Sequence, residues 1–273
     1  MEIGNNEMNE IESELTLVFH IGLDSFSYAI LNKKRYFKTL KIFDIDENNI
    51  ELEIMRILNS TQELKQIFQK SIGSIDKCTN TFIPKVLFNH KYIKDYINFN
   101  STNTKQETHL YNEQVFTKCY SIFSIQTNIL NNLKKNLSNL DIKHTSSVFV
   151  DYAIKLSKKD EKHIFIQVNK QDFHIAYIEN LNFIFYNQFE YNNNDDFLYH
   201  YLNCLNVLRL DHNDIKINIM SVLEKNHIIF QIIRKYTPNH RFLNRLNNFH
   251  YSNQIIQSEE HKNHNIFSQL ICE

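Results

Sequence analysis

The pattern of hydrophobic and polar positions along residues 162–211 predicts three strands followed by a helix. His163–Val168 is a short apolar run of the kind that forms a strand buried on both faces. Residues 173–178 and 183–189 continue with β-branched and aromatic side chains, and short polar turns separate the three runs. The same order of elements recurs earlier in the chain and therefore indicates its overall organisation.

The helix behind these strands has a clear start and one apolar face. The stretch Asn192–Asp196 supplies a loop and an N-cap, and its acidic pair falls at the positive end of the helix dipole. Residues 215–220 predict a fourth strand. Apolar residues recur along the helix at steps of three and four, namely Leu198, Tyr201, Leu202, Leu205 and Leu208.

An earlier segment repeats this order at an offset of 147 residues, which sets Phe19–Phe26 against Ile166–Phe173. Residues 46–49 then align with 193–196, and a helical pattern over residues 50–70 follows. The repeat predicts two related lobes of mixed α/β structure. The expected division is a tail (1–13), a first lobe (14–145), a second lobe (146–250) and a C-terminal tail (251–273).

The rest of the chain is predicted to form short strands, helices and loops. Residues 100–108 form the clearest exposed loop, and the apolar ending Ile266–Ile271 is expected to dock on the body of the protein rather than on a partner. Further predicted elements are strands at 15–43 (three), 72–79, 81–84, 108–114 and 117–124, and helices at 85–99, 125–137, 146–157 and 227–235.

Composition and charge exclude several classes of protein. Hydrophobic residues make up 42% of the chain, enough for one large core or two ordinary ones, while the net charge of −1 argues against binding nucleic acid or membrane over the whole surface. No apolar run approaches the roughly 20 residues needed to span a bilayer. Residues 1–14 are acidic and polar, unlike a signal peptide, and the four scattered cysteines have no metal-site spacing. A cytoplasmic protein with reduced thiols is expected.

Two stretches resemble a bacterial protein family, namely Phe-Ile-Pro-Lys-Val-Leu-Phe at 82–88 and residues 189–210, which include Asp195-Asp-Phe-Leu-Tyr199. The family is of unknown function (domain of unknown function 3822), and it is distantly similar to the pilus-assembly protein PilM. The resemblance spans roughly Leu15 to Asn248. It implies an actin-like ATPase fold made of duplicated ribonuclease-H-like lobes, and it implies no activity.

The same resemblance locates a cleft whose usual chemistry is missing. Actin-like ATPases hold Mg-nucleotide with one Asp-x-Gly hairpin loop in each lobe, and the corresponding triplets here are His20-Ile-Gly22 and Gln167-Val-Asn169. The adenosine-side Gly-Gly motif is absent because the only glycines are Gly4, Gly22 and Gly73. A degenerate nucleotide site of this kind would consist of His20, Gly22, Asp24, Ser25, Gln167 and Asn169.

The neighbouring residues are interpreted mainly as structural. A two-metal nuclease needs a carboxylate near His20 on the first strand, and none is present there. Asp24 and Asp172 lie at turns, where Asp is favoured for local hydrogen bonds, so we expect no metal there. A histidine that ends a buried strand, such as His20, is expected to be a satisfied core group. Gly22 is expected to serve the turn.

Two other groups of residues have side chains of the kinds found in binding sites. His261 and His264, with Glu259 and Glu260, lie in a polar segment that is expected to be solvated rather than to hold metal. The stretch 234–251 interleaves basic residues with Tyr236, Phe242, Phe249 and Tyr251, a pattern that also occurs in single-stranded nucleic-acid binding. The aromatic residues are interpreted as core and the charges as a solvated face.

The sequence therefore favours a non-catalytic, actin-like protein-binding or scaffold module. An unidentified protein partner is expected, with no membrane, no nucleic acid and no cofactor, and the oligomeric state stays open. The alternatives are a weak or atypical actin-like ATPase that binds ATP with Mg²⁺, and an RNA-associated factor that uses the Arg234–Arg245 region.

Overall fold

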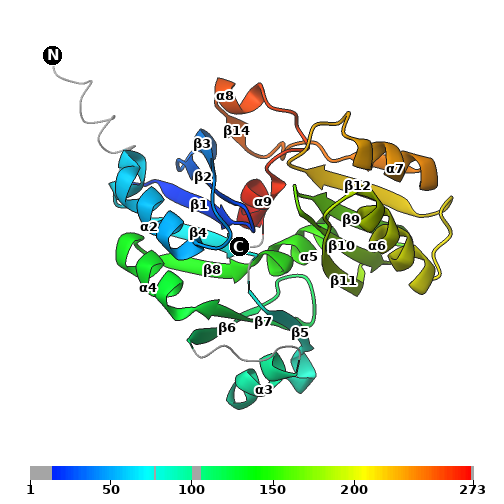
Figure 1. Cartoon of the computed structure of the whole chain (residues 1–273), viewed down its shortest axis with the longest axis horizontal. Helices are drawn as coiled ribbons and strands as arrows, with labels where there is room; N and C mark the ends of the chain where they lie inside the picture. The colour runs from blue at the N-terminus through cyan, green and yellow to red at the C-terminus, as the bar shows by residue number, and fades with distance from the viewer. Residues whose placement is uncertain (1–13, 77, 100–105, 272–273) are drawn as a thin grey trace. The chain divides into compact units, whose positions relative to one another are not determined.

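The computed structural model describes residues 14–76, 78–99 and 106–271, and it divides into two compact units (Figure 1). The first unit comprises Met1–Val148, Asn247–Ile256 and Asn265–Glu273. The second comprises Phe149–Leu246 and Gln257–His264. The division falls inside helix α5 (Thr145–Leu156). No helix of the described residues is long and apolar enough to cross a bilayer.

The first unit is built on a six-stranded mixed sheet with the order β14-β3-β2-β1-β4-β8. The three consecutive strands β1, β2 and β3 pair antiparallel, while β4 and β8 continue the sheet in parallel on the other side of β1. The strands are β1 (Thr16–Ile21), β2 (Ser25–Leu31), β3 (Tyr36–Asp44), β4 (Lys70–Ile75), β8 (Leu140–His144) and β14 (His250–Tyr251).

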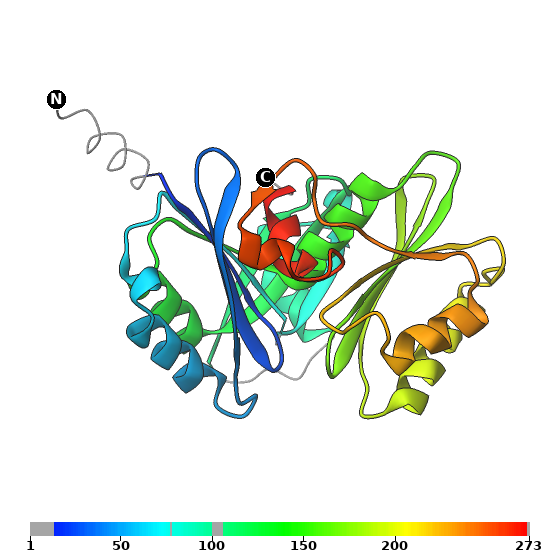
Figure 2. The ribbon, with the colours of Figure 1, turned by 90° about the horizontal axis from the view of Figure 1, so that it is seen from above.

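Helices α2 (Ile50–Ser60) and α4 (Thr127–Asn136) lie together on one face of this sheet (Figures 1 and 2). The predicted apolar face of α2 is confirmed, because its four buried residues are Ile50, Ile54, Ile57 and Leu58. The helical pattern ends sooner than expected, since a short 3-10 turn, η1 (Gln62–Lys65), follows α2. These helices and the sheet enclose the first core.

The second unit repeats the arrangement in a five-stranded sheet with the order β11-β10-β9-β12-β13. Helices α6 (Asn194–Val207) and α7 (Ile228–Tyr236) lie on one face of it (Figure 2). The Asn193 side chain caps α6, as the polar stretch before it predicts. The strands are β9 (Lys162–Val168), β10 (Asp172–Glu179), β11 (Asn182–Glu190), β12 (Lys216–Ser221) and β13 (His240–Phe242).

The register of the two first hairpins matches the predicted repeat. Ile21 pairs with Phe26 in the first unit, and Val168 pairs with Phe173 in the second, so the offset of 147 residues holds at both positions. Each first strand also pairs in parallel with the strand that follows the first helix. The two units therefore have the same β-β-β-α-β-α-β topology, that of duplicated ribonuclease-H-like lobes.

A three-stranded antiparallel sheet, β5-β7-β6, is inserted between β4 and α4. Its strands are β5 (Asn80–Pro84), β6 (Glu107–Glu113) and β7 (Cys119–Gln126). The prediction of one helical stretch over residues 85–99 is wrong. Two 3-10 turns, η2 (Lys85–Leu87) and η3 (His90–Tyr92), precede the short helix α3 (Ile93–Asn98). Most of the expected loop at 100–108 lies outside the described residues.

The C-terminal segment packs on the first unit, as its apolar ending predicts. Phe267, in α9 (His264–Phe267), contacts Phe37 and Tyr251, with ring centroids 4.9 and 5.2 Å apart. The segment lies on the sheet face opposite α2 and α4 (Figure 2). The described residues of this region also include α8 (Asn253–Ile256) and the 3-10 turn η4 (Ser268–Ile271).

We predict that Gly73→Ala destabilises the protein more than Gly22→Ala does. A Cβ atom at Gly73 would lie 2.1 Å from Cζ of the buried Phe19, so the ring must move out of the core. At Gly22 the nearest atom to a Cβ would be the Ser25 Oγ, at 3.1 Å. Overpacking of this kind costs about 1–3 kcal/mol. Urea unfolding gives the free energy of unfolding of both variants. A Gly73→Ala protein as stable as the parent would refute the packing argument.

Candidate functional site

The hairpin between β1 and β2 contains four of the residues expected in the cleft. His20 is the penultimate residue of β1, and Ser25 opens β2. The Gly22 N–H donates to the Ser25 carbonyl oxygen at 2.8 Å, and the Asp24 carbonyl accepts from the Ile45 N–H at 2.9 Å. The φ angle of Gly22 is not positive, so the turn requires a small residue for space and not a left-handed backbone.

His20 is buried, and both of its ring nitrogens have partners. Its Nδ1 lies 3.0 Å from the Ser74 Oγ and 3.4 Å from the Thr145 Oγ1, and its Nε2 lies 3.3 Å from the Asp76 Oδ2. Ser74 stands directly opposite His20 in the parallel register of β1 and β4. His20 is therefore the satisfied core group that its position predicts.

The combination of Ser74, His20 and Asp76 invites comparison with a nucleophilic serine triad. Such a triad needs a serine oxygen that a substrate can reach. Ser74 is 0% exposed and His20 is 2% exposed. This cluster therefore fixes β1 against β4 and carries no nucleophilic chemistry.

The hairpin between β9 and β10 has the same closing bond and different side chains. The Asn169 N–H donates to the Asp172 carbonyl oxygen at 2.9 Å, and the Asn169 Nδ2 lies 3.1 and 3.2 Å from the two carboxylate oxygens of Asp172. The Tyr191 hydroxyl donates to the Asn169 carbonyl at 2.5 Å. Gln167 is buried in β9, and its Nε2 has no hydrogen-bond partner within the part of the chain that the structure describes.

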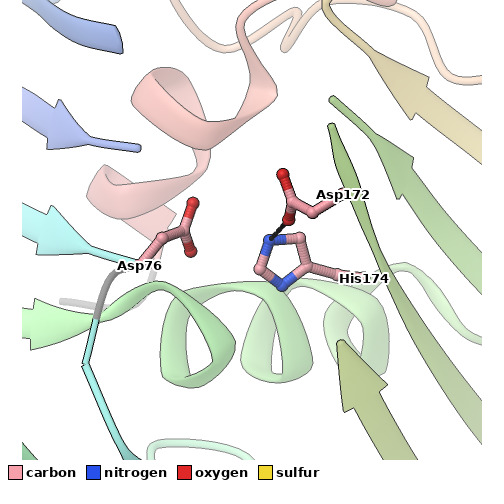
Figure 3. A group of neighbouring side chains, drawn as sticks. All are labelled: Asp76, Asp172 and His174. Atoms are coloured by element: carbon pink, nitrogen blue, oxygen red, sulfur yellow. Dashed lines mark ion pairs between the residues drawn. The ribbon is translucent and has the colours of Figure 1, made fainter. Parts of the chain in front are cut away.

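Asp172 is the centre of a buried polar network in the second unit (Figure 3). Its Oδ2 lies 3.3 Å from the His174 Nε2, the pair marked by the dashed line, and accepts from the Gln188 Nε2 at 2.9 Å. The His174 Nδ1 lies 2.9 Å from the Tyr186 hydroxyl. The local hydrogen bond expected of Asp172 is confirmed, since its carboxylate accepts from Asn169.

Sequence reasoning missed Asp76 and His174, both of which are labelled in Figure 3. Asp76 directly follows β4, at the carboxyl end of a parallel strand, where polar ligand-binding groups gather in α/β sheets. His174 lies two residues after Asp172 and so shares its face of β10. Asp76 could have been found from its place at the carboxyl end of a strand, and His174 by applying strand periodicity to polar residues as well as to apolar ones.

A pocket of about 300 Å³ lies in the first unit at the carboxyl ends of β1 and β4, another feature that the sequence did not reveal. Four isoleucines from separate elements line it: Ile21, Ile50, Ile75 and Ile129. Its polar part comes from the β3–α2 connection, the first turn of α2 and the end of β7. These residues include Glu47, Glu51 and Gln126, beside the exposed Leu52.

The expectation that His261 and His264 are solvated is wrong. Their exposed fractions are 0% and 2%. The His261 ring packs edge-on against Phe242, its Nε2 lies 2.8 Å from the Leu223 carbonyl oxygen, and its own carbonyl accepts from the Ser221 N–H. Backbone hydrogen bonds and ring contacts bury this polar segment, and neither shows in a hydrophobicity pattern.

The basic stretch is tied into the second unit. The Arg241 Nε donates to the Asn218 Oδ1 at 2.8 Å, and the Arg245 guanidinium donates to the Ser258 carbonyl oxygen at 2.9 Å. Phe242 packs against the second core, as predicted. Since these arginine donors serve the protein's own backbone and side chains, the RNA-associated alternative gains no support here.

Comparison with known proteins gives one family and a fold. The model of the family described as "Protein of unknown function (DUF3822)" matches residues 5–240. No curated protein matches the chain.

The solved structures that are similar over nearly the whole chain include the following two. One is a Bacteroides thetaiotaomicron protein with an actin-like ATPase fold and unknown function. It is 18% identical with a TM-score of 0.82, and the match covers 99% of this chain and 100% of that one. The other is the PilM–PilN type IV pilus biogenesis complex, at 8% identity and a TM-score of 0.60, covering 93% and 96%. The chain has an actin-like ATPase fold.

We predict that His264 makes the protein less stable in acid. Burial lowers the pKa of this histidine from 6.5 to about 4. The unfolded chain therefore binds a proton near pH 6.5 that the folded chain excludes until about pH 4, and stability falls as the pH drops through that window. The expected loss is about 3 kcal/mol.

Unfolding free energies measured between pH 7 and pH 4 test this prediction. The free energy of unfolding should depend less steeply on pH in His264→Gln than in the parent protein. The pH dependence should stay unchanged when the exposed His250 is replaced by Gln. Equal slopes in the parent protein and in His264→Gln would contradict it.

Proposed function

The chain belongs to the DUF3822 family of proteins of unknown function, and we propose that it is a non-catalytic protein-binding module with an actin-like fold. In this function the two hairpins lack nucleotide chemistry, and the pocket of the first unit receives a partner protein.

The hairpin residues do not fit the Mg-nucleotide arrangement of actin-like ATPases. Where that arrangement has an Asp in each loop, this chain has His20, engaged with Ser74, and the neutral Gln167. Asn169 replaces the second glycine, and its side chain and carbonyl are both hydrogen-bonded within the unit. In the proposed function these residues therefore take no part in hydrolysis.

The single observation that carries the protein-binding part is the pocket of the first unit. It combines an apolar floor of four buried isoleucines with a polar rim, and Leu52 beside it is 65% exposed. Mixed apolar and polar lining of this kind suits a side chain of another protein. The structural neighbour PilM was solved in a complex with PilN, so the fold serves protein assembly in that neighbour.

One observation favours a second candidate function, an atypical site for ATP with Mg²⁺. Each unit has a buried carboxylate close to its first hairpin, Asp76 in the first and Asp172 in the second. Carboxylates are the protein ligands that Mg²⁺ prefers. Against this function, the Asp172 carboxylate already accepts from Asn169 and Gln188.

We expect calorimetric titration with ATP, with and without Mg²⁺, to give no binding heat. Millimolar ATP should also leave the melting temperature unchanged, because a ligand stabilises only the state that it binds. Binding that requires Mg²⁺ would establish the second function instead. In that case Asp172→Asn and Gly22→Leu should abolish it, while Asp195→Asn, on the exposed first turn of α6, should not.

A photo-cross-linking residue at position 52 is expected to give a discrete adduct with a partner protein in cells that express the chain. Val207 in the second unit is 70% exposed and serves as the matched control position. The adduct should form from position 52 and not from position 207. No adduct at either position, or the same adduct at both, would contradict a partner site at the pocket.

A further inference from the structure

We propose that the pocket of the first unit receives a lysine or arginine side chain from a basic segment of the partner protein. This inference rests on the proposed protein-binding function and specifies the chemistry of its partner. The pocket's floor, its charge and its size each bear on the identity of the occupant.

The floor of the pocket suits the aliphatic part of a long side chain. Ile21 ends β1 and Ile75 ends β4, and they form the closed base of the pocket, so the apolar surface open to an occupant comes mainly from the exposed Leu52. Ile50 and Ile129, from the first turns of α2 and α4, complete the floor. Lysine and arginine bury their methylene stems along such surfaces while the charged end stays near polar groups.

The rim of the pocket is negative. Glu47 and Glu51 bring two carboxylates, Gln126 is neutral, and none of the described residues lining the pocket is basic. The Glu51 Oε2 lies 3.5 Å from the neutral Asn128 Nδ2, so this carboxylate keeps its charge. The amino end of the α2 dipole carries about half a positive charge, which is less than the charge of one carboxylate. A cationic group is therefore favoured at the rim, and its attraction should weaken as salt rises.

The same charges exclude other occupants. A phosphate, a nucleotide or the carboxyl terminus of a peptide would place negative charge against Glu47 and Glu51. The chain's own residues 1–13 contain four glutamates and no lysine or arginine, so that segment lacks the cationic side chain that the rim favours. A basic segment of a different protein is the occupant that the charges favour.

The size of the pocket and the residue beside it indicate a peptide rather than a free small molecule. A volume of about 300 Å³ is at the lower end of the roughly 300–1,000 Å³ range of small-molecule sites. It accommodates one long side chain. Leu52, which is 65% exposed, offers an apolar contact for a neighbouring residue of the same segment.

The test uses three blocked heptapeptides, Ala-Leu-Ala-X-Ala-Leu-Ala, with X as lysine, norleucine or glutamate. Protein labelled at the isoleucine δ1 methyl groups is titrated with each peptide and followed by NMR. The lysine peptide should shift the methyl signals of Ile75 and Ile129 to saturation. The norleucine peptide should bind more weakly, and the glutamate peptide should cause no shift.

Variants of the rim separate charge from shape. Replacing Glu47 and Glu51 together by Gln should weaken binding of the lysine peptide about 5- to 30-fold. At the exposed Gln126, a change to Glu should strengthen binding and a change to Lys should weaken it. Glu190→Gln, an exposed change in the second unit, is the matched control and should leave the affinity unchanged.

Equal binding of the lysine and glutamate peptides, or no methyl shift with millimolar lysine peptide, would overturn the inference. So would an affinity that is insensitive to the charge at position 126. The proposed function fails separately, when no cross-link forms from position 52. A cross-link from position 52 to a partner, with no preference for the basic peptide, would retain the protein-binding role and refute the basic occupant.

Discussion

The contact between Phe19 and Gly73 is the packing constraint on which the first unit depends. Phe19 is fully buried, and its ring fills the space that any side chain at position 73 would need. The two residues stand opposite each other in the parallel register of β1 and β4. This register sets His20 beside Ser74 and brings Ile21 level with Ile75. The buried polar cluster and the floor of the pocket therefore both follow from one strand pairing.

The duplicated topology was predictable because periodic apolar patterns indicate most of its strands and helices. Long runs with many apolar positions, such as residues 162–190 and the helix after them, gave the β-β-β-α-β order with which both units begin. The strands His240–Phe242 and His250–Tyr251 were missed because they contain too few residues to show a period. Leu140–His144 was missed as well, because only two of its five residues are buried and its pattern is weak. Residues 85–99 look helical by spacing, but they form two 3-10 turns, which begin after Pro84 and Asn89, and only then the short helix α3.

The candidate site was harder to predict because it depends on residues that are distant in sequence. His20 and Gln167 were identified by position, yet the partners of His20 come from β4 and α5, more than fifty residues away. The two units have also diverged at equivalent positions. Ser25 and Ser27 in the first correspond to Asp172 and His174 in the second. A shared hairpin therefore fixes the backbone and leaves the polar chemistry free to differ.

The alternation of side chains along a strand explains how one sheet can hold a closed polar cluster on one face and an open pocket on the other. Successive residues of a strand point to opposite faces, so His20 and Ile21 serve different faces of the first sheet. Ser74 and Ile75 do the same on β4. The face with the histidine is closed by internal hydrogen bonds, whereas the isoleucine face opens at its carboxyl end into the pocket. Changes at the pocket rim, such as Glu51 or Gln126, can alter partner chemistry without disturbing the buried cluster, because no strand residue belongs to both.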